Sequence, residues 1–290
     1  MDSRDYVCAF DINCACDAPA DFELPQQASN AIAGVFLPQG EPDWLGRRKY
    51  PARMLLVTDE ELWVIPHAAA GGRPERIVLR ELETLECGRM LLLGWIGLHA
   101  GSVAQTLEYN QRSGDVVDRF VAGLKARWLR REPGVCRLPR QTFGEALDQK
   151  FDFAWSFEAI DEREQPLIRY FQPATRRLRR RFLFRRESWT AGDLLVVTDR
   201  RVLWITERHG TVYAPYGTVS RSAPLSALSS IQCGSHGAEA HLTMVLQSGR
   251  TWTIPAGEGR ADDARNVAEA ITKALACVGR NAPSPIRPRA

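Results

Sequence analysis

The chain concentrates arginine in one short stretch, the part of the sequence best suited to bind an anion. The basic residues between Arg169 and Arg186 include a dense group: Arg176, Arg177, Arg179, Arg180, Arg181, Arg185 and Arg186. Guanidinium groups form bidentate hydrogen bonds with phosphate, and clustered basic residues attract an anionic membrane surface. The cluster therefore predicts a patch for an anionic ligand, such as lipid headgroups or an acidic protein partner.

A structural interpretation of the same arginines stays open. They alternate with Leu178, Phe182 and Phe184, as on a strand that has one solvated face and one face in a core. They could also pair with nearby carboxylates. Nucleic acid is an unlikely partner, because 35 acidic residues nearly balance 38 basic ones and no nucleic-acid-binding motif is present.

Cysteines and aspartates near the start of the chain have the residue types of a metal site: Cys8, Asp11, Cys14, Cys16 and Asp17. Zinc sites usually take cysteines two to four residues apart, with a second pair of ligands elsewhere. Cys14 and Cys16 have one residue between them and no second pair follows, so we expect no metal and free thiols. Seven scattered cysteines also do not indicate a disulfide framework.

Catalytic motifs are missing from the sequence. We find no glycine-rich phosphate loop, no Gly-x-Ser-x-Gly, no His-Glu-x-x-His and no carboxylate pair in a defined setting. We therefore expect a protein that is not an enzyme and takes no cofactor.

The elements that position these residues come from a repeat. Residues 55–65 and 194–205 each contain an apolar run, a Thr-Asp pair, two charged residues and a second apolar run with tryptophan. Such runs favour β-strands, and an aspartate at this point is suited to start the turn between them. We therefore expect two hairpins with matched structural residues: Thr58, Asp59 and Trp63 in the first, Thr198, Asp199 and Trp204 in the second.

The repeat continues after each hairpin. Cys87-Gly88 corresponds to Cys233-Gly234, and a further pair of apolar stretches around a glycine turn follows in both copies. Each copy then ends in a helix-like pattern, with apolar residues at a shared offset: Phe120, Leu124 and Trp128 in the first, Val267, Ile271 and Leu275 in the second. Spacing of four residues puts one apolar stripe of each helix against a core.

With its two hairpins and closing helices, the chain resembles the bacterial PH-like and GRAM-like families of the pleckstrin-homology fold. The residues that carry the resemblance are 56–63 and 197–204, and the first copy is one residue shorter between threonine and tryptophan. The resemblance implies a mainly β (α+β) protein with two PH-like bent antiparallel barrels, each capped by a C-terminal α-helix. It also implies binding modules rather than an enzyme, with lipid or protein ligands.

The domain boundaries follow from the repeat and from composition. We expect a flexible N-terminal arm over 1–27, a first domain over 28–132 and a linker over 133–142. The second domain covers 143–278 and starts with a helix over 143–160, where apolar residues cover a wide face. Prolines after Gly279 predict a disordered tail over 279–290.

Length and composition limit the function. The 290 residues suffice for two domains, the net charge is only +3, and no apolar run approaches the roughly 20 residues that span a bilayer. We expect a noncatalytic cytoplasmic adaptor that binds a protein partner or assembles with itself. The alternative is peripheral binding to anionic lipid at the inner face of the membrane through the arginine cluster; nucleic-acid binding and an unrecognised enzyme are lesser alternatives.

Overall fold

The structure is a computed structural model that describes residues 8–40, 51–90, 92–131, 139–158, 164, 166–181, 184–208, 217–236 and 239–281. The chain divides into two compact units. Unit 1 comprises Met1–Arg130 with His209–Val219, and unit 2 comprises Arg131–Arg208 with Ser220–Ala290. The described strands form open sheets of five, eight and three strands and a separate two-stranded ribbon.

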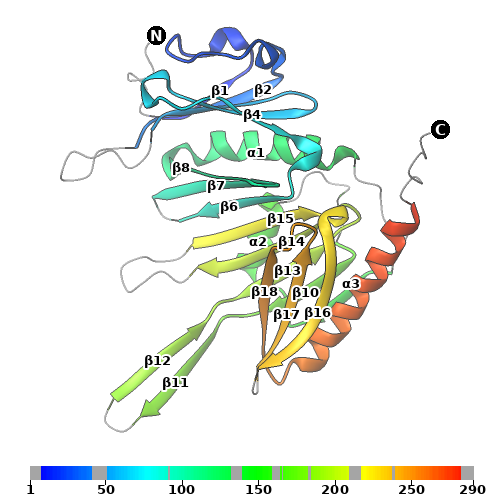
Figure 1. Ribbon diagram of the computed structural model, residues 1–290. Helices are drawn as coiled ribbons and strands as arrows, with labels where there is room; N and C mark the ends of the chain where they lie inside the picture. Colours follow the sequence, from blue (N-terminus) through cyan, green and yellow to red (C-terminus); the bar gives the residue numbers. More distant parts are fainter. Residues whose placement is uncertain are drawn as a thin grey trace, which may run out of the picture. The chain divides into compact units, whose positions relative to one another are not determined.

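The first five strands of unit 1 form an antiparallel sheet in chain order (Figure 1). They are β1 (Phe10–Ile12), β2 (Ala33–Leu37), β3 (Arg53–Val57), β4 (Glu61–Pro66) and β5 (Glu75–Val78). An antiparallel meander follows, made of β6 (Thr84–Arg89), β7 (Leu93–Ala100) and β8 (Val103–Asn110), and helix α1 (Gly114–Trp128) comes next. The short 3-10 helices are η2 (Ala15–Asp17), η3 (Gln26–Asn30), η4 (Ala68–Ala70), η5 (Leu79–Glu81), η6 (Gln111–Ser113) and η7 (Leu129–Arg131).

Helix α1 buries the apolar stripe that the sequence predicts. Its buried residues include Val117, Phe120, Val121, Leu124 and Trp128. The Trp128 indole nitrogen donates a hydrogen bond to the carbonyl oxygen of Leu82, at 2.8 Å. The predicted amphipathic helix of the first copy is thus confirmed, and its polar tryptophan group is satisfied by the backbone.

The described part of the predicted N-terminal arm is packed rather than flexible. Strand β1 pairs with β2, and the Ile12 side chain is only 1 % exposed. Phe22 joins the same apolar cluster and meets Phe36 edge to face, with ring centroids 5.8 Å apart. Burial of the Ile12 and Phe22 side chains fixes this segment in place. Its polar composition, with several Pro and Ala residues, did not predict that these side chains belong to a core.

Unit 2 begins with β9 (Gln141–Gly144), α2 (Gln149–Glu158) and β10 (Ile168–Gln172). Strands β11 (Thr175–Arg181) and β12 (Phe184–Thr190) pair only with each other, and the ribbon extends away from the rest of unit 2 in Figure 1. Next come β13 (Asp193–Val197), β14 (Arg201–Arg208) and β15 (Gly217–Pro224), whose residues from Ser220 onward belong to this unit. The last elements are η8 (Leu225–Ala227), β16 (Leu228–His236), β17 (Glu239–Leu246), β18 (Thr251–Glu258) and α3 (Ala261–Asn281).

The predicted helix over 143–160 is shorter than expected. Residues Gln141–Gly144 form β9, which pairs in parallel with β10, and the helix begins only at Gln149. Gly144 has φ +79°, and a Cβ at this position would lie 2.1 Å from the Phe171 carbonyl oxygen. Only glycine fits this left-handed, crowded position, so a strand ends where the pattern predicted a helix to begin.

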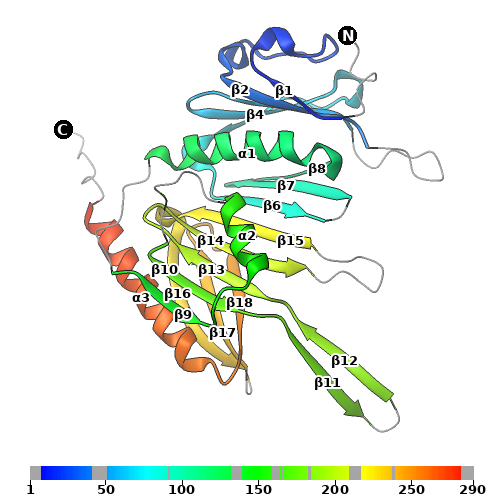
Figure 2. The ribbon, with the colours of Figure 1, turned by 180° about the vertical axis from the view of Figure 1, so that it is seen from behind.

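The hairpin β13–β14 is buried on both faces. Leu194, Val196, Leu203 and Ile205 pack with Phe151 of α2, which lies over these strands in Figure 2. The alternate residues of the same strands pack into a second cluster with residues of β16, β17, β18 and α3. Because successive side chains of a strand point to opposite faces, one hairpin supplies two hydrophobic layers.

The prediction of two PH-like bent antiparallel barrels, each capped by a C-terminal helix, is wrong. None of the described sheets closes into a barrel; the described strands form open sheets of five, eight and three strands instead. The double burial of β13–β14 gives the physical reason. A barrel strand turns one face to the interior and the other to solvent, whereas these strands lie between two apolar layers.

Candidate binding groove along strand β16

Unit 2 contains a groove of about 690 Å³ between strand β16 and helix α3, which run beside each other in Figure 1. The strand contributes five consecutive residues, β17 contributes one, and α3 contributes one face. The lining residues are Ile231, Gln232, Cys233, Gly234, Ser235, Ala240, Ala261, Arg265, Ala268, Glu269, Thr272 and Lys273.

Strand β16 is an edge of its sheet. In the order β16-β17-β18, β17 is the only strand among the described residues that pairs with β16. An edge strand presents backbone N–H and C=O groups on its free side, and those groups can pair with another extended chain. The groove follows this edge, so it offers backbone hydrogen-bonding groups as well as side chains.

The groove has an apolar floor and a polar rim. Ile231, Ala240 and Ala268 are 7 %, 4 % and 8 % exposed, so they form a surface largely withdrawn from water. Gln232 and Ser235 of the strand are exposed at the rim. This arrangement fits a ligand with an apolar side chain pointing inward and a polar surround.

Helix α3 presents two adjacent stripes. Ala264, Val267, Ile271 and Ala274 are fully buried in the core of unit 2, which confirms the predicted amphipathic helix of the second copy. A neighbouring stripe with spacing of three and four residues lines the groove: Ala261, Arg265, Ala268 and Thr272. The core stripe fixes the helix, so the groove stripe is held in place without a ligand.

The helix supplies both signs of charge to the groove. Glu269 and Lys273 are exposed, and the Arg265 guanidinium lies 2.7 Å from the Asp262 carboxylate. Arg265 is 62 % exposed in its side chain, so this surface pair adds little to stability. Exposed charges of both signs at the rim of the groove can, however, orient a bound polar segment.

A glycine opposite an aromatic ring recurs in both copies of the repeat. A Cβ on Gly234 would lie 2.6 Å from the His241 ring, its cross-strand partner, and a Cβ on Gly88 would lie 2.0 Å from the ring of Trp95. The matched Cys-Gly pairs of the sequence thus provide space for a ring across the ladder. Because neighbouring residues of a strand face opposite sides, Cys233 and His241 lie on opposite faces of the sheet.

The matched threonines stabilise the turns of both hairpins. In the first turn the Thr58 hydroxyl accepts from the backbone N–H groups of Glu60 and Glu61, at 3.3 and 3.0 Å. In the second the Thr198 hydroxyl accepts from those of Arg200 and Arg201, both at 3.2 Å. The acceptor that starts these turns is therefore threonine rather than Asp59 or Asp199.

The matched tryptophans have similar surroundings. Trp63 and Trp204 are each 7 % exposed. The Trp63 indole donates to a Glu61 carboxylate oxygen at 3.1 Å, and the Trp204 indole donates to Asp193 Oδ1 at 2.8 Å. Burial raises the pKa of Asp193 to about 6, although the hydrogen bond from Trp204 opposes this shift. Both tryptophans act in packing, and neither lines the groove.

The arginine cluster lies in the β11–β12 ribbon and not in the groove. The backbone register places Arg179 opposite Arg186 and Arg180 opposite Arg185. Arg176 and Arg177 lie opposite Trp189 and Ser188, and Arg181 lies opposite Phe184. Phe182, part of the predicted alternation, lies outside the described residues.

Cys14 and Cys16 form a disulfide, so the expectation of free thiols is wrong for this pair. Cys8 does carry a free, exposed thiol. With Asp17, the two bonded cysteines make the single group of potential metal ligands among the described residues. Sulfurs bonded to each other have no thiolate to offer a metal, so the oxidised pair does not form a metal site.

A buried ionic network is the feature that sequence reasoning missed. Arg201 is fully buried, and its guanidinium donates to both oxygens of Glu164 at 2.8 Å, to Ser222 at 3.1 Å and to the Glu158 carbonyl oxygen. Ser220 donates to the Glu158 carboxylate at 2.7 Å. The only sequence signal was an arginine where the first copy has a glutamate. The network connects Glu158 of α2 and Glu164 to β14 and β15.

In the described residues, no helix is both long and apolar enough to cross a membrane. No protein-family model matches the chain, and neither does any curated protein. The PH-like and GRAM-like resemblance therefore stays a prediction from the hairpin residues, and the groove geometry has to support any functional conclusion.

Proposed function

We propose that this chain is a noncatalytic binding protein that accepts an extended segment of a partner protein along the free edge of β16. The observation that carries the proposal is the position of the groove on an unpaired strand edge. Strand addition gives affinity through backbone hydrogen bonds, and pockets for alternate side chains give specificity.

The dimensions of the groove suit a short strand. Residues 231–235 of β16 line it, and five residues of extended chain span roughly 13 Å between the first and last Cα atoms. The apolar floor at Ile231, Ala240 and Ala268 would receive a side chain of the added strand. The rim residues of α3 would contact the side chains that point away from the floor.

The chemistry of the groove favours binding over catalysis. Cys233 is the one residue with a nucleophilic thiol among the described residues that line the groove, and none of those lining residues is a histidine. His241 faces away from Cys233 across the sheet, so it does not serve as the base that a cysteine nucleophile needs. We also propose a cytoplasmic location, which the free thiols of Cys8 and Cys233 support.

Selection of short peptides from a random phage-displayed library on the full chain tests the proposal. Thr272→Arg introduces an arginine at an exposed position that lines the groove. Asn266→Arg introduces an arginine at an exposed position of α3 outside the groove. We expect Thr272→Arg to weaken the selected peptides at least roughly tenfold, and Asn266→Arg to leave affinity unchanged. Equal effects of both variants would contradict the proposal. Light scattering distinguishes a second copy of the chain from a different partner.

A second candidate function is binding to an anionic lipid surface through the β11–β12 ribbon. The register that places Arg179 opposite Arg186 and Arg180 opposite Arg185 favours this candidate. The register brings four of the clustered arginines together on one short ribbon. An anionic membrane surface attracts basic residues at roughly 1 kcal/mol each.

Cosedimentation with vesicles tests this candidate. Retention on phosphatidylserine vesicles but not on phosphatidylcholine, lost when Arg179, Arg180 and Arg181 become glutamate, would support it. A matched triple change to glutamate at the exposed Arg73, Arg80 and Arg130 controls for net charge. Equal loss in both triple variants would indicate a net-charge effect and would refute a specific role of the ribbon.

A further inference from the structure

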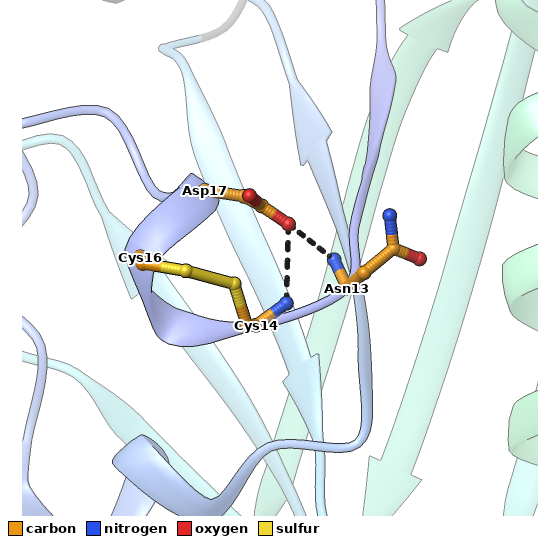
Figure 3. Close-up of a disulfide and its surroundings, with 4 residues drawn as sticks. All are labelled: Asn13, Cys14, Cys16 and Asp17. Atoms are coloured by element: carbon orange, nitrogen blue, oxygen red, sulfur yellow. Dashed lines mark hydrogen bonds between the residues drawn. A yellow bond between two sulfur atoms is a disulfide. The ribbon is translucent and has the colours of Figure 1, made fainter.

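The disulfide between Cys14 and Cys16 lies in a turn that other bonds already hold (Figure 3). The Asp17 backbone N–H donates to the Cys14 carbonyl oxygen at 3.0 Å. One oxygen of the Asp17 carboxylate accepts from the backbone N–H groups of Asn13 at 2.9 Å and Cys14 at 3.2 Å. These three hydrogen bonds involve no sulfur, so the turn retains its own supports when the disulfide opens.

The covalent bond adds little as a structural staple. The stabilisation that a disulfide gives through chain entropy increases with the length of the loop it closes. Here the two cysteines are separated by a single residue, so the bond restricts the unfolded chain very little. A role in chemistry accounts for the pair better than a role in stability.

The pair is accessible to a reagent in solution. Cys16 is exposed and Cys14 is partly exposed, whereas Cys87 is buried. The two sulfurs and a carboxylate oxygen of Asp17 all lie within 4.8 Å of one another. A thiolate can therefore approach Cys16 from solvent. The carboxylate of Asp17 lies beside the disulfide bond that would break.

We propose that Cys14–Cys16 is a reversible dithiol–disulfide site that exchanges with thiols of the glutathione class. A thiolate attacks Cys16 Sγ, a new S–S bond forms to the attacking sulfur, and Cys14 leaves as a thiolate that takes a proton from water. A second thiolate attacks the small molecule's sulfur in the mixed disulfide, the mixed S–S bond breaks, and Cys16 leaves as a thiolate that takes a proton from water. The protein disulfide is thereby reduced by two electrons to two thiols, and the two small thiols are oxidised to one disulfide.

Asp17 controls the rate of this exchange. Its carboxylate disfavours a thiolate on Cys14, because two negative charges within 4.8 Å repel each other. A poorer leaving group slows the opening of the disulfide. Asp17→Asn removes the charge and keeps an amide oxygen that can accept from the same backbone N–H groups, so it should open roughly threefold faster.

Differential alkylation of the full folded chain tests the proposal. The protein is equilibrated with oxidised or reduced glutathione, quenched in acid, blocked with N-ethylmaleimide, reduced, and labelled with iodoacetamide before mass spectrometry of the peptides. We expect the iodoacetamide label on Cys14 and Cys16 after oxidised glutathione and the maleimide label after reduced glutathione, with full return on re-oxidation. Circular dichroism should stay unchanged throughout. Repeating the reduction with a protein dithiol such as thioredoxin distinguishes a protein reductant from a small one.

Two outcomes would overturn the proposal: maleimide on both cysteines after oxidised glutathione, or a bond that opens only once the protein is unfolded. Cys14→Ser should trap one glutathione on Cys16, and Cys16→Ser should trap less on the partly buried Cys14. Equal trapping would refute Cys16 as the attacked sulfur. An unchanged opening rate in Asp17→Asn would refute the role of the carboxylate.

Discussion

Asp193 is expected to make the stability of the protein depend on pH in a direction unusual for a carboxylate. Its side chain is almost completely buried, accepts the Trp204 indole N–H at 2.8 Å, and has a pKa raised to about 6, chiefly by burial. Asp193→Asn removes the titration and keeps an oxygen that can accept the indole hydrogen bond. The variant therefore isolates the charge from the packing.

The magnitude follows from the shift. A pKa raised from 3.8 to about 6 is a change of about two units, and each unit corresponds to about 1.4 kcal/mol, so the full effect is about 3 kcal/mol. Between these two values the folded state binds more protons than the unfolded state. The contribution of Asp193 to stability is therefore fully present below about pH 4, and it is lost as the pH rises through about 6.

Urea unfolding followed by tryptophan fluorescence measures the effect at several pH values from about 3 to about 7. The free energy of unfolding of the wild type minus that of Asp193→Asn should fall by about 3 kcal/mol over this range, because other titrating groups cancel in the difference. A difference that stays constant with pH, or that grows as the pH rises, would refute the assignment of a raised pKa to this carboxyl.

Three further changes test the packing by urea unfolding. Arg201→Met removes the buried guanidinium that pairs with Glu164 and should cost about 3–5 kcal/mol, most of which Glu164→Gln in the same chain should recover; no recovery would contradict a charge effect. Phe151→Ala should cost about 3–5 kcal/mol because the ring is 1 % exposed. Phe153→Ala, where the residue is 65 % exposed, should change stability by less than about 0.5 kcal/mol. Similar costs for the two variants would contradict the assignment of Phe151 to the core face of α2. Gly88→Ala should cost about 1–3 kcal/mol, because the new methyl group would overlap the indole ring across the ladder; a neutral result would disprove that close packing.

The sequence was sufficient for the local elements that have strong periodic patterns. The apolar runs around Thr58 and Thr198 form hairpins, and both closing helices bury the stripes that their spacing predicts. Hairpins and amphipathic helices depend on residues close in the chain, so their patterns can be read locally.

The arrangement of the sheets could not be read in this way. Residues 194–197 are apolar at every position, and a continuous apolar run does not say whether a strand lies inside a barrel or between two layers. Residues 194 and 196 contact Phe151 of α2, and this contact shows that the strand lies between two apolar layers. The apolar residues over 143–160 predicted a helix there, but they did not show that this helix packs on β13 and β14.

The groove and the buried network depend on long-range contacts. Gln232 and Ser235 look like ordinary strand residues, and only the sheet order shows that they lie on a free edge. Glu164 and Arg201 are 37 residues apart, so no local sequence pattern shows that they pair. The bond between Cys14 and Cys16 matches neither the spacing of zinc ligands nor the pattern of a disulfide framework, so neither pattern predicts it.

Hydrogen–deuterium exchange tests the central claim most directly, with a peptide selected on the full chain as the probe. Binding along the edge of β16 should slow exchange of backbone amides within residues 231–235 and on the groove face of α3, because the added strand pairs with free backbone groups. Thr272→Arg should abolish this protection and Asn266→Arg should retain it. Protection that falls elsewhere in the chain, with the β16 amides unchanged, would contradict the account.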